Sequence, residues 1–414
     1  MVKLTAKFSF MEEWKKYIVG NICSITSSKR IFANEYQSSG IPFFRGKEII
    51  EKQKGKNIST ELYISESKYN QIKSKFGVPK EGDMLLTAVG TLGIPYIVKD
   101  ETFYFKDGNL TWFSDFKNIN SKYLYYWFLS PIAKNAIDAI AIGSTQKALT
   151  IDALSKIEIS IPSINTQNKI VSILSSLDSK IELNRRINDN LEQQAQALFK
   201  AWFVDFEPFG GAIPKDWEIC EAQKIFNINI GKTPPRNETK WFSKVKADYK
   251  WASITDLGKC GLFIGDTSEY LTQEAVDTFN IIIVPTGTVL LSFKLTLGRT
   301  AITTCPLTTN EAIARFLINY DYEREYLYLL LKQYDYTSLG NTSSIATAVN
   351  SKIIKNMPII MPSVDVLQQF HNAVSPMFNR MRYLSNESIQ LSEIRDTLLP
   401  KLMSGELKIN DLNC

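Results

Sequence analysis

The sequence IPSINTQNKIVSILSSLDSKIELNRRINDNLEQQAQALFKAWF occupies residues 161–203, and MPSVDVLQQFHNAVSPMFNRMRYLSNESIQLSEIRDTLLPKLMS occupies residues 361–404. In both stretches, alternating steps of four and three residues, begun at Ile170 and at Phe370, fall mainly on apolar side chains for more than four heptads. A period of 3.5 residues kept over that length is typical of coiled-coil helices. Because the two patterns share one register at an offset of 200 residues, we predict two long coiled-coil helices.

Polar residues interrupt both apolar seams. Asn184 and Asn188 lie in the middle of the first seam, and Ser388 occupies the position equivalent to Asn188 in the second. Buried polar residues in a coiled coil lower stability but fix register and orientation. If the helices pack antiparallel, the two asparagines face roughly Ser388 and Leu384. Pro376 lies early in the second pattern, so we expect it to kink that helix or to delay its start.

The segments that precede the two helices also repeat each other. DMLLT at residues 83–87 recurs as TVLLS at 288–292, and TLG at 91–93 recurs at 296–298, both at an offset of 205. The patterns in these segments predict strands at 94–98, 102–105 and 280–284, and aromatic-rich helices at 121–129 and 324–332. We therefore predict a mixed α/β (α+β) fold, made by tandem duplication of a globular domain followed by a long helix.

Composition excludes several classes of protein. The 414 residues are 44% hydrophobic and 22% charged, which is ordinary for a globular protein and excludes disordered and collagen-like chains. His371 is the only histidine, and the five cysteines are scattered without a CxxC pair, so we predict no metal site and no disulfide framework. No apolar run of 18 residues and no signal peptide are present. We expect a cytoplasmic protein that does not enter a membrane.

The net charge of +5 is unevenly distributed. Residues 1–160 carry +6 and residues 210–360 carry +1, whereas residues 161–209 and 361–414 carry −1 each. In the second block, basic residues alternate with aromatic ones between Lys232 and Trp251. Such a mixture is typical of surfaces that neutralise phosphates while aromatic rings stack. A solvated loop over a small aromatic cluster explains the same pattern, and charge alone leaves both interpretations open.

Motifs for catalysis are absent or incomplete. The only Pro-Pro pair, Pro234-Pro235, follows Thr233, so the Asn/Asp-Pro-Pro-aromatic loop of adenine methyltransferases is missing. Gly231-Lys232-Thr233 resembles the end of a phosphate-binding loop, but Phe226 stands where the first glycine belongs. Glu-x-Lys triplets do not recur between the halves, and no Gly-x-Ser-x-Gly turn is present. We therefore predict that the chain is not itself catalytic.

The chain resembles the specificity (S) subunits of type I restriction–modification systems over essentially its whole length. The resemblance rests on the order and duplication of short motifs, chiefly GSTQK at 143–147, LFKAWFVDFEPF at 198–209 and LLPKLMSGEL at 398–407. It implies two target-recognition domains, at residues 1–163 and 210–363, each recognising one half of a bipartite DNA site. It further implies that segments 164–209 and 364–414 form an antiparallel, pseudo-two-fold spacer.

The resemblance also implies partners and cofactors. The spacer would dock two methyltransferase (M) subunits, and motor-nuclease restriction (R) subunits would join them. S-adenosylmethionine would then belong to M, and ATP with Mg²⁺ to R, leaving no cofactor on this chain. In the second half, SSIAT at residues 343–347 replaces GSTQK, so a role carried by Gln146 and Lys147 has no equivalent there.

Candidate DNA contacts come from the basic and polar residues of these motifs. Lysines and arginines would contact phosphates, and a few side chains would contact bases in the grooves. Gln146 can bond adenine, and Arg299 can bond guanine, through two hydrogen bonds each. The predicted set is Lys29, Arg30, Arg45, Lys47, Thr87, Thr91, Gln146 and Lys147 in the first domain, and Lys232, Arg236, Lys240, Ser292, Lys294 and Arg299 in the second.

Two other functions fit part of the pattern. The chain could be a self-contained DNA-modifying enzyme with a diverged site, although the missing Pro-Pro-aromatic loop argues against it. It could also be a coiled-coil scaffold for protein assembly that does not bind DNA. A DNA-binding protein shows a steep dependence of affinity on salt concentration, whereas a scaffold shows none.

Overall fold

The computed structural model describes residues 14–55, 58, 60–144, 146–246, 248–339 and 349–407. The chain divides into two units, which we describe one at a time. Unit 1 comprises residues 1–183 and 388–414, and unit 2 comprises residues 184–387. Each unit therefore contains part of both long helices, α7 (Ile164–Phe203) and α13 (Val364–Ser404).

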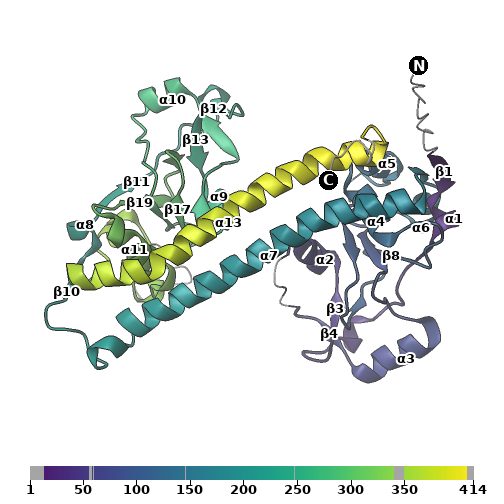
Figure 1. Ribbon diagram of the computed structural model, residues 1–414, viewed down its shortest axis with the longest axis horizontal. Helices are drawn as coiled ribbons and strands as arrows, with labels where there is room; N and C mark the ends of the chain where they lie inside the picture. Colours follow the sequence, from purple (N-terminus) through teal and green to yellow (C-terminus); the bar gives the residue numbers. More distant parts are fainter. Residues whose placement is uncertain are drawn as a thin grey trace, which may run out of the picture. The chain divides into compact units, whose positions relative to one another are not determined.

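The two long helices pack against each other in opposite directions (Figure 1). In unit 1, Arg395 Nη1 of α13 donates to Asp178 Oδ1 of α7 at 2.8 Å. In unit 2, Asn188 Nδ2 of α7 donates to Ser385 Oγ of α13 at 3.1 Å. Residue numbers thus rise along one helix as they fall along the other, which confirms the predicted pair of long helices and their antiparallel arrangement.

Pro376 does not delay the start of the second helix, so that one of the two expected outcomes was wrong, and the expected kink stays a prediction. Helix α13 begins at Val364 and continues without interruption to Ser404. Proline removes one backbone hydrogen bond, but Val374 and Phe378 on either side of it are buried in the core of unit 2. Burial of two such side chains contributes about 3–6 kcal/mol, which offsets the lost bond.

The described residues of unit 1 form three small sheets and several short helices. One sheet has the order β2-β8-β5-β6, a second the order β4-β3-β7, and β1 pairs with β9. The strands are β1 (Lys15–Ile18), β2 (Ser24–Thr26), β3 (Ile41–Phe44), β4 (Tyr63–Ile64), β5 (Met84–Thr87), β6 (Pro95–Ile97), β7 (Tyr104–Phe105), β8 (Leu110–Ser114) and β9 (Glu158–Ile161). The helices are α1 (Val19–Ile22), α2 (Gly46–Gln53), α3 (Glu66–Phe76), α4 (Ser121–Leu129), α5 (Pro131–Ile140) and α6 (Ile151–Ser155).

Unit 2 repeats this plan. Its sheets have the orders β11-β19-β16-β17-β14 and β12-β15-β13-β18, and β10 pairs with β20. The strands are β10 (Glu218–Glu221), β11 (Asn227–Ile230), β12 (Phe242–Ser243), β13 (Tyr249–Ala252), β14 (Phe263–Ile264), β15 (Glu269–Leu271), β16 (Val289–Ser292), β17 (Thr300–Thr303), β18 (Thr308–Thr309), β19 (Ile313–Leu317) and β20 (Pro358–Met361). The helices are α8 (Ala222–Ile225), α9 (Ile254–Leu257), α10 (Gln273–Thr278), α11 (Arg324–Gln333) and α12 (Ser351–Lys355).

The duplication extends to individual hydrogen bonds. Strand β3 is parallel to β7 in unit 1, as β13 is to β18 in unit 2. The turn after β5 is closed by Gly93 N donating to Thr87 O at 2.8 Å, and the turn after β16 by Gly298 N donating to Ser292 O at 3.0 Å. The mixed α/β class and the tandem duplication are therefore confirmed.

The predicted short elements were mostly right. The strands expected at 94–98 and 102–105 appear as the shorter β6 and β7, and the expected aromatic helices are α4 and α11. The strand expected at 280–284 is absent: Asn280 has φ +47°, and Val284 forms only an isolated bridge with Leu307. This apolar run closes the core as a loop, so its β-branched composition was misleading.

Helices α4 and α11 attach the sheets to the long helices. Tyr126 Oη of α4 donates to Asp178 Oδ2 of α7 at 2.7 Å, and Tyr328 Oη of α11 donates to Glu192 Oε1 of α7 at 2.9 Å. His371 Nδ1 on α13 lies 2.7 Å from Glu325 Oε2 of α11, a packing role rather than a catalytic one. Among the described residues, no helix is long and apolar enough to cross a membrane.

Candidate nucleic-acid interface

In unit 1, the C-terminal ends of strands β3, β5 and β7 lie close together. Strands β3 and β7 run parallel, so the residues after them, Arg45 and Lys106, are neighbours; Lys106 N donates to Phe44 O at 2.8 Å. Ala88, which follows β5, donates its N–H to Asn109 O at 2.8 Å. The residues that follow β3, β5 and β7 therefore meet at one place, which we call the unit 1 edge.

Arg45 is fixed at this edge by the start of α2. Its backbone N–H donates to Glu48 Oε2 at 2.8 Å and its Nη2 donates to Glu48 Oε1 at 2.7 Å. Burial alone would raise the pKa of the Glu48 carboxyl, but the Arg45 guanidinium and backbone N–H groups outweigh it and hold that pKa below its ordinary value. Arg45 is half-buried, and its Nε also donates to Glu48 Oε2 at 3.3 Å, so its guanidinium is held in one position at the edge.

Two loops meet beside the same edge. Ile142 and Ala148 exchange backbone hydrogen bonds of 3.0 and 2.9 Å, which closes the loop between them. Gly90 N, in the turn after β5, donates to Lys147 O at 3.4 Å. Thr91, Gln146 and Lys147 are all exposed. The structure therefore brings these three predicted residues together, although they are far apart in sequence; Thr145 lies outside the described residues.

The other predicted residues of unit 1 lie at the surface. Arg30 Nε donates to Asp107 Oδ2 at 2.9 Å, which holds Arg30 next to the residues that follow β7. Lys29 donates its backbone N–H to Tyr104 Oη at 2.7 Å, and its Nζ lies 4.6 Å from the centre of the Phe76 ring. Lys47 is exposed on the first turn of α2, with its Nζ 3.9 Å from Glu51 Oε1.

Thr87 and Ser292 require a correction, because both are fully buried. The Thr87 hydroxyl accepts from Ile94 N at 2.9 Å, and the Ser292 hydroxyl accepts from Arg299 N at 3.1 Å. Each side chain closes the turn after its strand and is too buried to contact DNA. The repeated Thr/Ser therefore reflects turn geometry, and we do not retain these two residues as contacts.

Arg299 is held by contacts within unit 2. Its Nη1 donates to Ile254 O at 2.8 Å, and the guanidinium lies against Gly258 so closely that an added Cβ there would come within 2.4 Å of Nη1. The side chain thus fastens the β16–β17 turn to α9. This bond occupies one of the five N–H groups of the guanidinium, and two-bond recognition of guanine needs a free pair on one face, so the role of Arg299 in base recognition stays a prediction.

The remaining candidates of unit 2 lie around an aromatic cluster. The Arg236 guanidinium forms an ion pair of 2.9 Å with Glu269 and stacks on Phe242 and Trp251, with ring-centre distances of 4.3 and 4.5 Å. Lys240 Nζ lies 4.1 Å from the Trp241 ring centre, and Lys232 Nζ donates to Phe279 O at 2.9 Å. The basic–aromatic alternation therefore builds a packed surface in which these cations already have protein partners.

Lys294 is placed differently, at the tip of the turn after β16. It is exposed, and its Nζ lies 5.7 Å from the centre of the Phe293 ring. The segment 343–347, which the sequence aligns with the Gln146–Lys147 loop, lies outside the described residues. In unit 2, the exposed candidate that most resembles those of the unit 1 edge is thus Lys294.

Sequence reasoning missed Lys106 in unit 1. Its counterpart in unit 2 is Asn310, because Asn310 N donates to Ala252 O at 3.0 Å just as Lys106 N donates to Phe44 O. Both follow a short buried strand that is parallel to another. The parallel pairing is long-range, so the sequence carried no local signal for this position.

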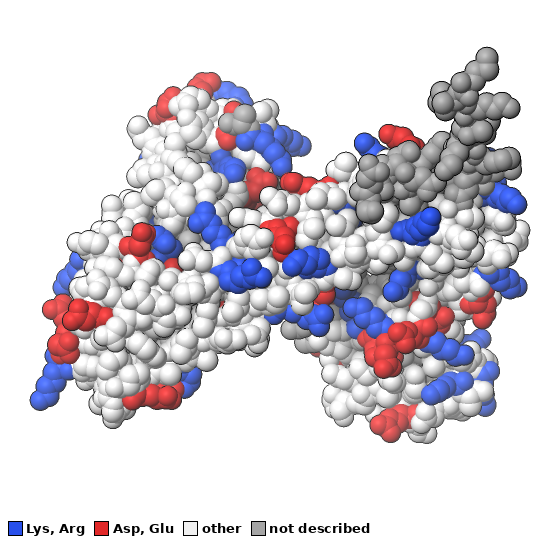
Figure 2. All heavy atoms as spheres, in the orientation of Figure 1, with Lys and Arg blue, Asp and Glu red and all other residues white. Residues whose placement is uncertain are grey.

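Charge on the surface is mixed rather than continuous. On the face drawn in Figure 2, blue and red side chains alternate over each unit, and neither unit shows an unbroken basic surface. Many exposed cations in the described residues have acidic neighbours, such as Lys16 with Glu158 at 2.7 Å. Local clusters of a few cations, rather than a general positive field, are therefore available for phosphate contacts.

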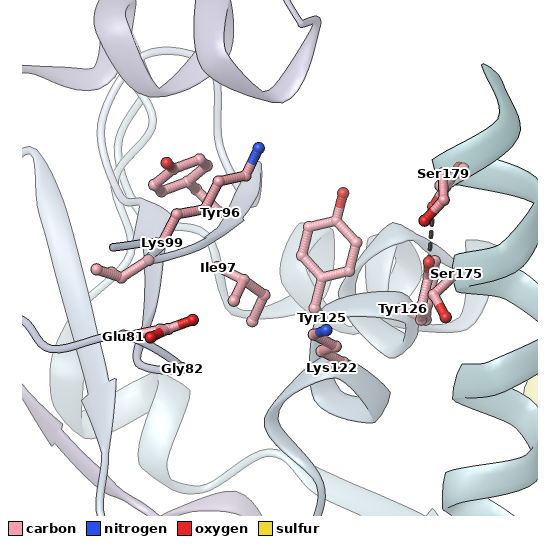
Figure 3. A pocket seen from close by; sticks show the side chains of 12 residues that line it. Glu81, Gly82, Tyr96, Ile97, Lys99, Lys122, Tyr125, Tyr126, Ser175 and Ser179 are labelled. Atoms are coloured by element: carbon pink, nitrogen blue, oxygen red, sulfur yellow. Dashed lines mark hydrogen bonds between the residues drawn. The ribbon is translucent and has the colours of Figure 1, made fainter. Parts of the chain in front are cut away.

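A pocket lies at the opposite end of the β5–β6 hairpin from the unit 1 edge (Figure 3). Its volume is about 320 Å³, and its walls come from β6, α4 and α7. Tyr96, Tyr125 and Tyr126 line it together with Lys99 and Lys122. Among the described residues, no group of three His, Cys, Asp or Glu side chains is arranged to hold a metal ion.

The predicted seam residues lie between the long helices in their expected region. Asn184 is fully buried, and its Nδ2 donates to Glu387 Oε2 at 2.7 Å and to Leu384 O at 3.5 Å. Asn188 Nδ2 donates to Ser385 Oγ, three residues before Ser388. Polar groups paired in this way favour one register over its neighbours, because any slip would leave them buried without partners.

Comparison with known proteins identifies the family. The model described as "Type I restriction modification DNA specificity domain" matches twice, at residues 11–193 and 214–387. The chain belongs to this family of type I restriction–modification specificity subunits. It is a sequence-specific DNA-recognition subunit and not an enzyme, as predicted.

Curated relatives and a solved structure match this chain over nearly its whole length. The chain is 28% identical to the type I restriction enzyme MjaIX specificity subunit of Methanocaldococcus jannaschii, over 91% of this chain and 89% of that protein. It is 26% identical to the HindI specificity subunit of Haemophilus influenzae, over 96% and 100%. The crystal structure of a type I S subunit from M. genitalium has the same fold, with a TM-score of 0.56 at 17% identity over 97% of this chain and 98% of that chain.

The Arg45–Glu48 contact predicts a pH-dependent contribution to the stability of this DNA specificity subunit. Glu48→Gln removes the charge that accepts from Arg45, so we expect the free energy of unfolding at pH 7 to fall by about 1–3 kcal/mol. Because the pKa of Glu48 is lowered by folding, its contribution is complete above the ordinary pKa and is lost as pH falls through the lower folded-state value.

Urea denaturation of the wild type and of Glu48→Gln at pH values from 7 to 3 measures this effect. The difference between them should be constant down to about pH 4.5 and then shrink. Glu51→Gln, three residues further along α2 and 3.9 Å from Lys47, is the control and should cost less than about 1 kcal/mol. A difference that stays constant down to pH 3 would show that the Glu48 charge is unimportant.

Proposed function

We propose that each unit recognises one half of a bipartite duplex DNA site. The target-recognition domains would be residues 1–163 and 210–363, and the spacer segments residues 164–209 and 364–414. The proposal is carried by the duplicated arrangement in which β3, β5 and β7 in unit 1, and β13, β16 and β18 in unit 2, deliver their following turns to one edge. Two equivalent edges in one chain suit a site with two halves.

In this proposal the unit 1 edge faces DNA. Lys106 and Lys147, with Lys29, Arg30, Arg45 and Lys47, would neutralise phosphates, and Gln146 would contact a base. In unit 2 the equivalent contacts would come from Lys294, together with Lys232, Arg236 and Lys240 of the basic–aromatic segment that precedes β13. Phosphate contacts position a protein on the duplex, and base contacts give specificity. We therefore assign the lysines and arginines to phosphates and the uncharged Gln146 to base recognition.

The long helices would set the spacing of the two half-sites and dock the partners. Helix α7 has 40 residues, which corresponds to about 60 Å at 1.5 Å per residue, more than one turn of DNA. The side-chain bonds of Asn184 and Asn188 between the helices, with Ser388 close by in the seam, would hold the register that keeps this spacing constant. A constant spacing is what a bipartite site requires.

We further propose that two methyltransferase (M) subunits bind the spacer and that restriction (R) subunits join the complex in the cytoplasm. S-adenosylmethionine would be bound by M, and ATP with Mg²⁺ by R. Exposed apolar side chains on the long helix support docking: Ile389 and Ile394 of α13 are 58% and 48% exposed. We take these two side chains as candidate contacts for M, and the double variant below tests them together.

The unit 1 edge can be tested by its salt dependence. Lys147→Ala should weaken binding to all duplexes similarly and reduce the slope of log K against log salt by about 1, because one phosphate contact is lost. Gln146→Ala should leave the slope unchanged and relax preference at one base pair. The measurement is a fluorescence-anisotropy titration of the chain with M from 50 to 300 mM salt.

Lys99→Ala is the matched control for this titration. Lys99 is exposed and lines the pocket at the opposite end of the β5–β6 hairpin, so neither affinity nor slope should change. Equal effects of Lys99→Ala and Lys147→Ala would contradict the assignment of the edge. If the wild type showed no salt slope at all, DNA recognition by this chain would itself be refuted.

Partner docking has its own test. Replacing both Ile389 and Ile394 by Glu should reduce co-elution of the chain with M at least tenfold, because charges placed in an apolar interface lose their hydration. Thermal unfolding of the chain alone should be unchanged, since both side chains are already exposed. Gln390→Glu adds a charge beside them as a control. Undiminished co-elution of the double variant would place the M interface elsewhere.

A further inference from the structure

Leu295 stands out in unit 2 because it is fully exposed and has a strained backbone. Its side chain is 100% exposed, and its φ is +62°. Leucine rarely adopts positive φ, because its Cβ then crowds the backbone. A large apolar side chain held in this way at the surface adds nothing to folding, which points to a function outside the folded chain.

The turn that carries Leu295 is held firmly below its tip. Ser292 Oγ donates to Thr296 O, and Gly298 N donates to Ser292 O at 3.0 Å. Leu297 packs on the core cluster of unit 2, and the Cα of Gly298 lies so near the Tyr336 ring that an added Cβ would come within 3.3 Å of it. The tip residue is therefore presented by a rigid support.

The equivalent turn of unit 1 has glycine where unit 2 has Leu295, and it also lacks the lysine beside it, because Val89 corresponds to Lys294. Residues 87–93 and 292–298 match one to one, so Gly90 is the counterpart of Leu295. Gly90 has φ +80°, a conformation that glycine adopts without strain, and a Cβ added there would meet nothing within 4 Å. Glycine is therefore the residue that adopts this backbone conformation at the lowest cost, and unit 2 has a leucine there instead.

The surroundings indicate what Leu295 meets. The adjacent Lys294 is exposed at the same tip, and the turn belongs to a DNA specificity domain. A cation beside a projecting aliphatic side chain matches proteins that hold a phosphate while inserting Leu, Ile, Met or Phe between base pairs. A protein partner would be expected to cover a wider apolar surface than a single side chain.

Resting on the proposed function, we propose that Leu295 is a wedge that inserts between two base pairs of the half-site recognised by unit 2. Insertion unstacks one step and Lys294 neutralises a phosphate beside it. Unit 1, with Gly90 at the corresponding tip, does not wedge its half-site. The two halves of the site are then distinguished by deformability as well as by base contacts.

The experiment uses the full chain in complex with M and a duplex carrying its methylation site, mapped beforehand in the host genome. Single 2-aminopurine substitutions along each half-site report unstacking by a rise in fluorescence. The target adenines are left unsubstituted, because a methyltransferase itself flips them out of the stack. At the other positions, one step in the unit 2 half-site should brighten with the wild type and no step in the unit 1 half-site should do so. Leu295→Gly should abolish the rise and lower affinity about tenfold, as expected for losing a buried aliphatic contact.

Stability separates a wedge from a structural residue. Leu295→Gly relieves the strain at positive φ, so its Tm should equal or exceed that of the wild type while its DNA affinity falls. Leu295→Asn tolerates the same backbone conformation and should also lose the fluorescence rise, whereas Leu295→Met should keep it. Val245→Asn, at another exposed apolar residue of unit 2, is the matched control and should change neither readout.

The possible results are distinct. Wild-type affinity and an unchanged fluorescence rise in Leu295→Gly would overturn the wedge while leaving the proposed function intact. Reduced affinity with no brightening in any wild-type duplex would also overturn it, in favour of a groove contact without insertion. A wild-type complex without sequence-specific binding would instead refute the proposed function itself.

Discussion

The antiparallel packing of α7 on α13 is the constraint on which the rest of the structure depends. The core of unit 1 contains Ile170 and Leu174 of α7 together with Leu399 and Leu402 of α13. The core of unit 2 contains Phe199 of α7 and Phe370 of α13 in the same way. Neither unit can complete its core without both helices, so segments about 200 residues apart in the chain must be paired before either edge is positioned. A change of register in the seam would disturb both cores at once, which explains why paired polar groups are kept there.

The repeated and periodic features of the fold could be predicted from the sequence. The 3.5-residue period, the offset of the duplicated motifs and the aromatic helices at 121–129 and 324–332 are local patterns, and each appears in the structure. The burial of Thr87 and Ser292 and the fastening of Arg299 to α9 could not be predicted, because they depend on which strands and loops lie opposite. The placement of Arg45 beside Lys106 depends on the parallel register between β3 and β7, which are far apart in sequence, and local sequence patterns do not predict that register.

The two units share the same arrangement of strands but have different residues at the tips of the turns that follow these strands. Lys106 corresponds to Asn310, and Gly90 to Leu295, while the buried closures of the turns by Thr87 and Ser292 are alike. Because the hydrogen bonds that close the turns are alike while the residues at their tips differ, one fold presents two different chemical surfaces. Each unit thereby presents a different set of turn residues on the same arrangement of strands, which would suit a DNA site whose halves have unrelated sequences.

The most direct test of this account is an exchange of residues 1–163 for the corresponding domain of a family member whose methylation site is known. The exchanged chain is expressed with its M partner, and methylated adenines are mapped across a genome. The account predicts that one half-site becomes that of the donor, while the other half-site and the spacing between them stay unchanged. If the second half-site changed, or if both changed together, recognition would not be divided between the two units and the account would be contradicted.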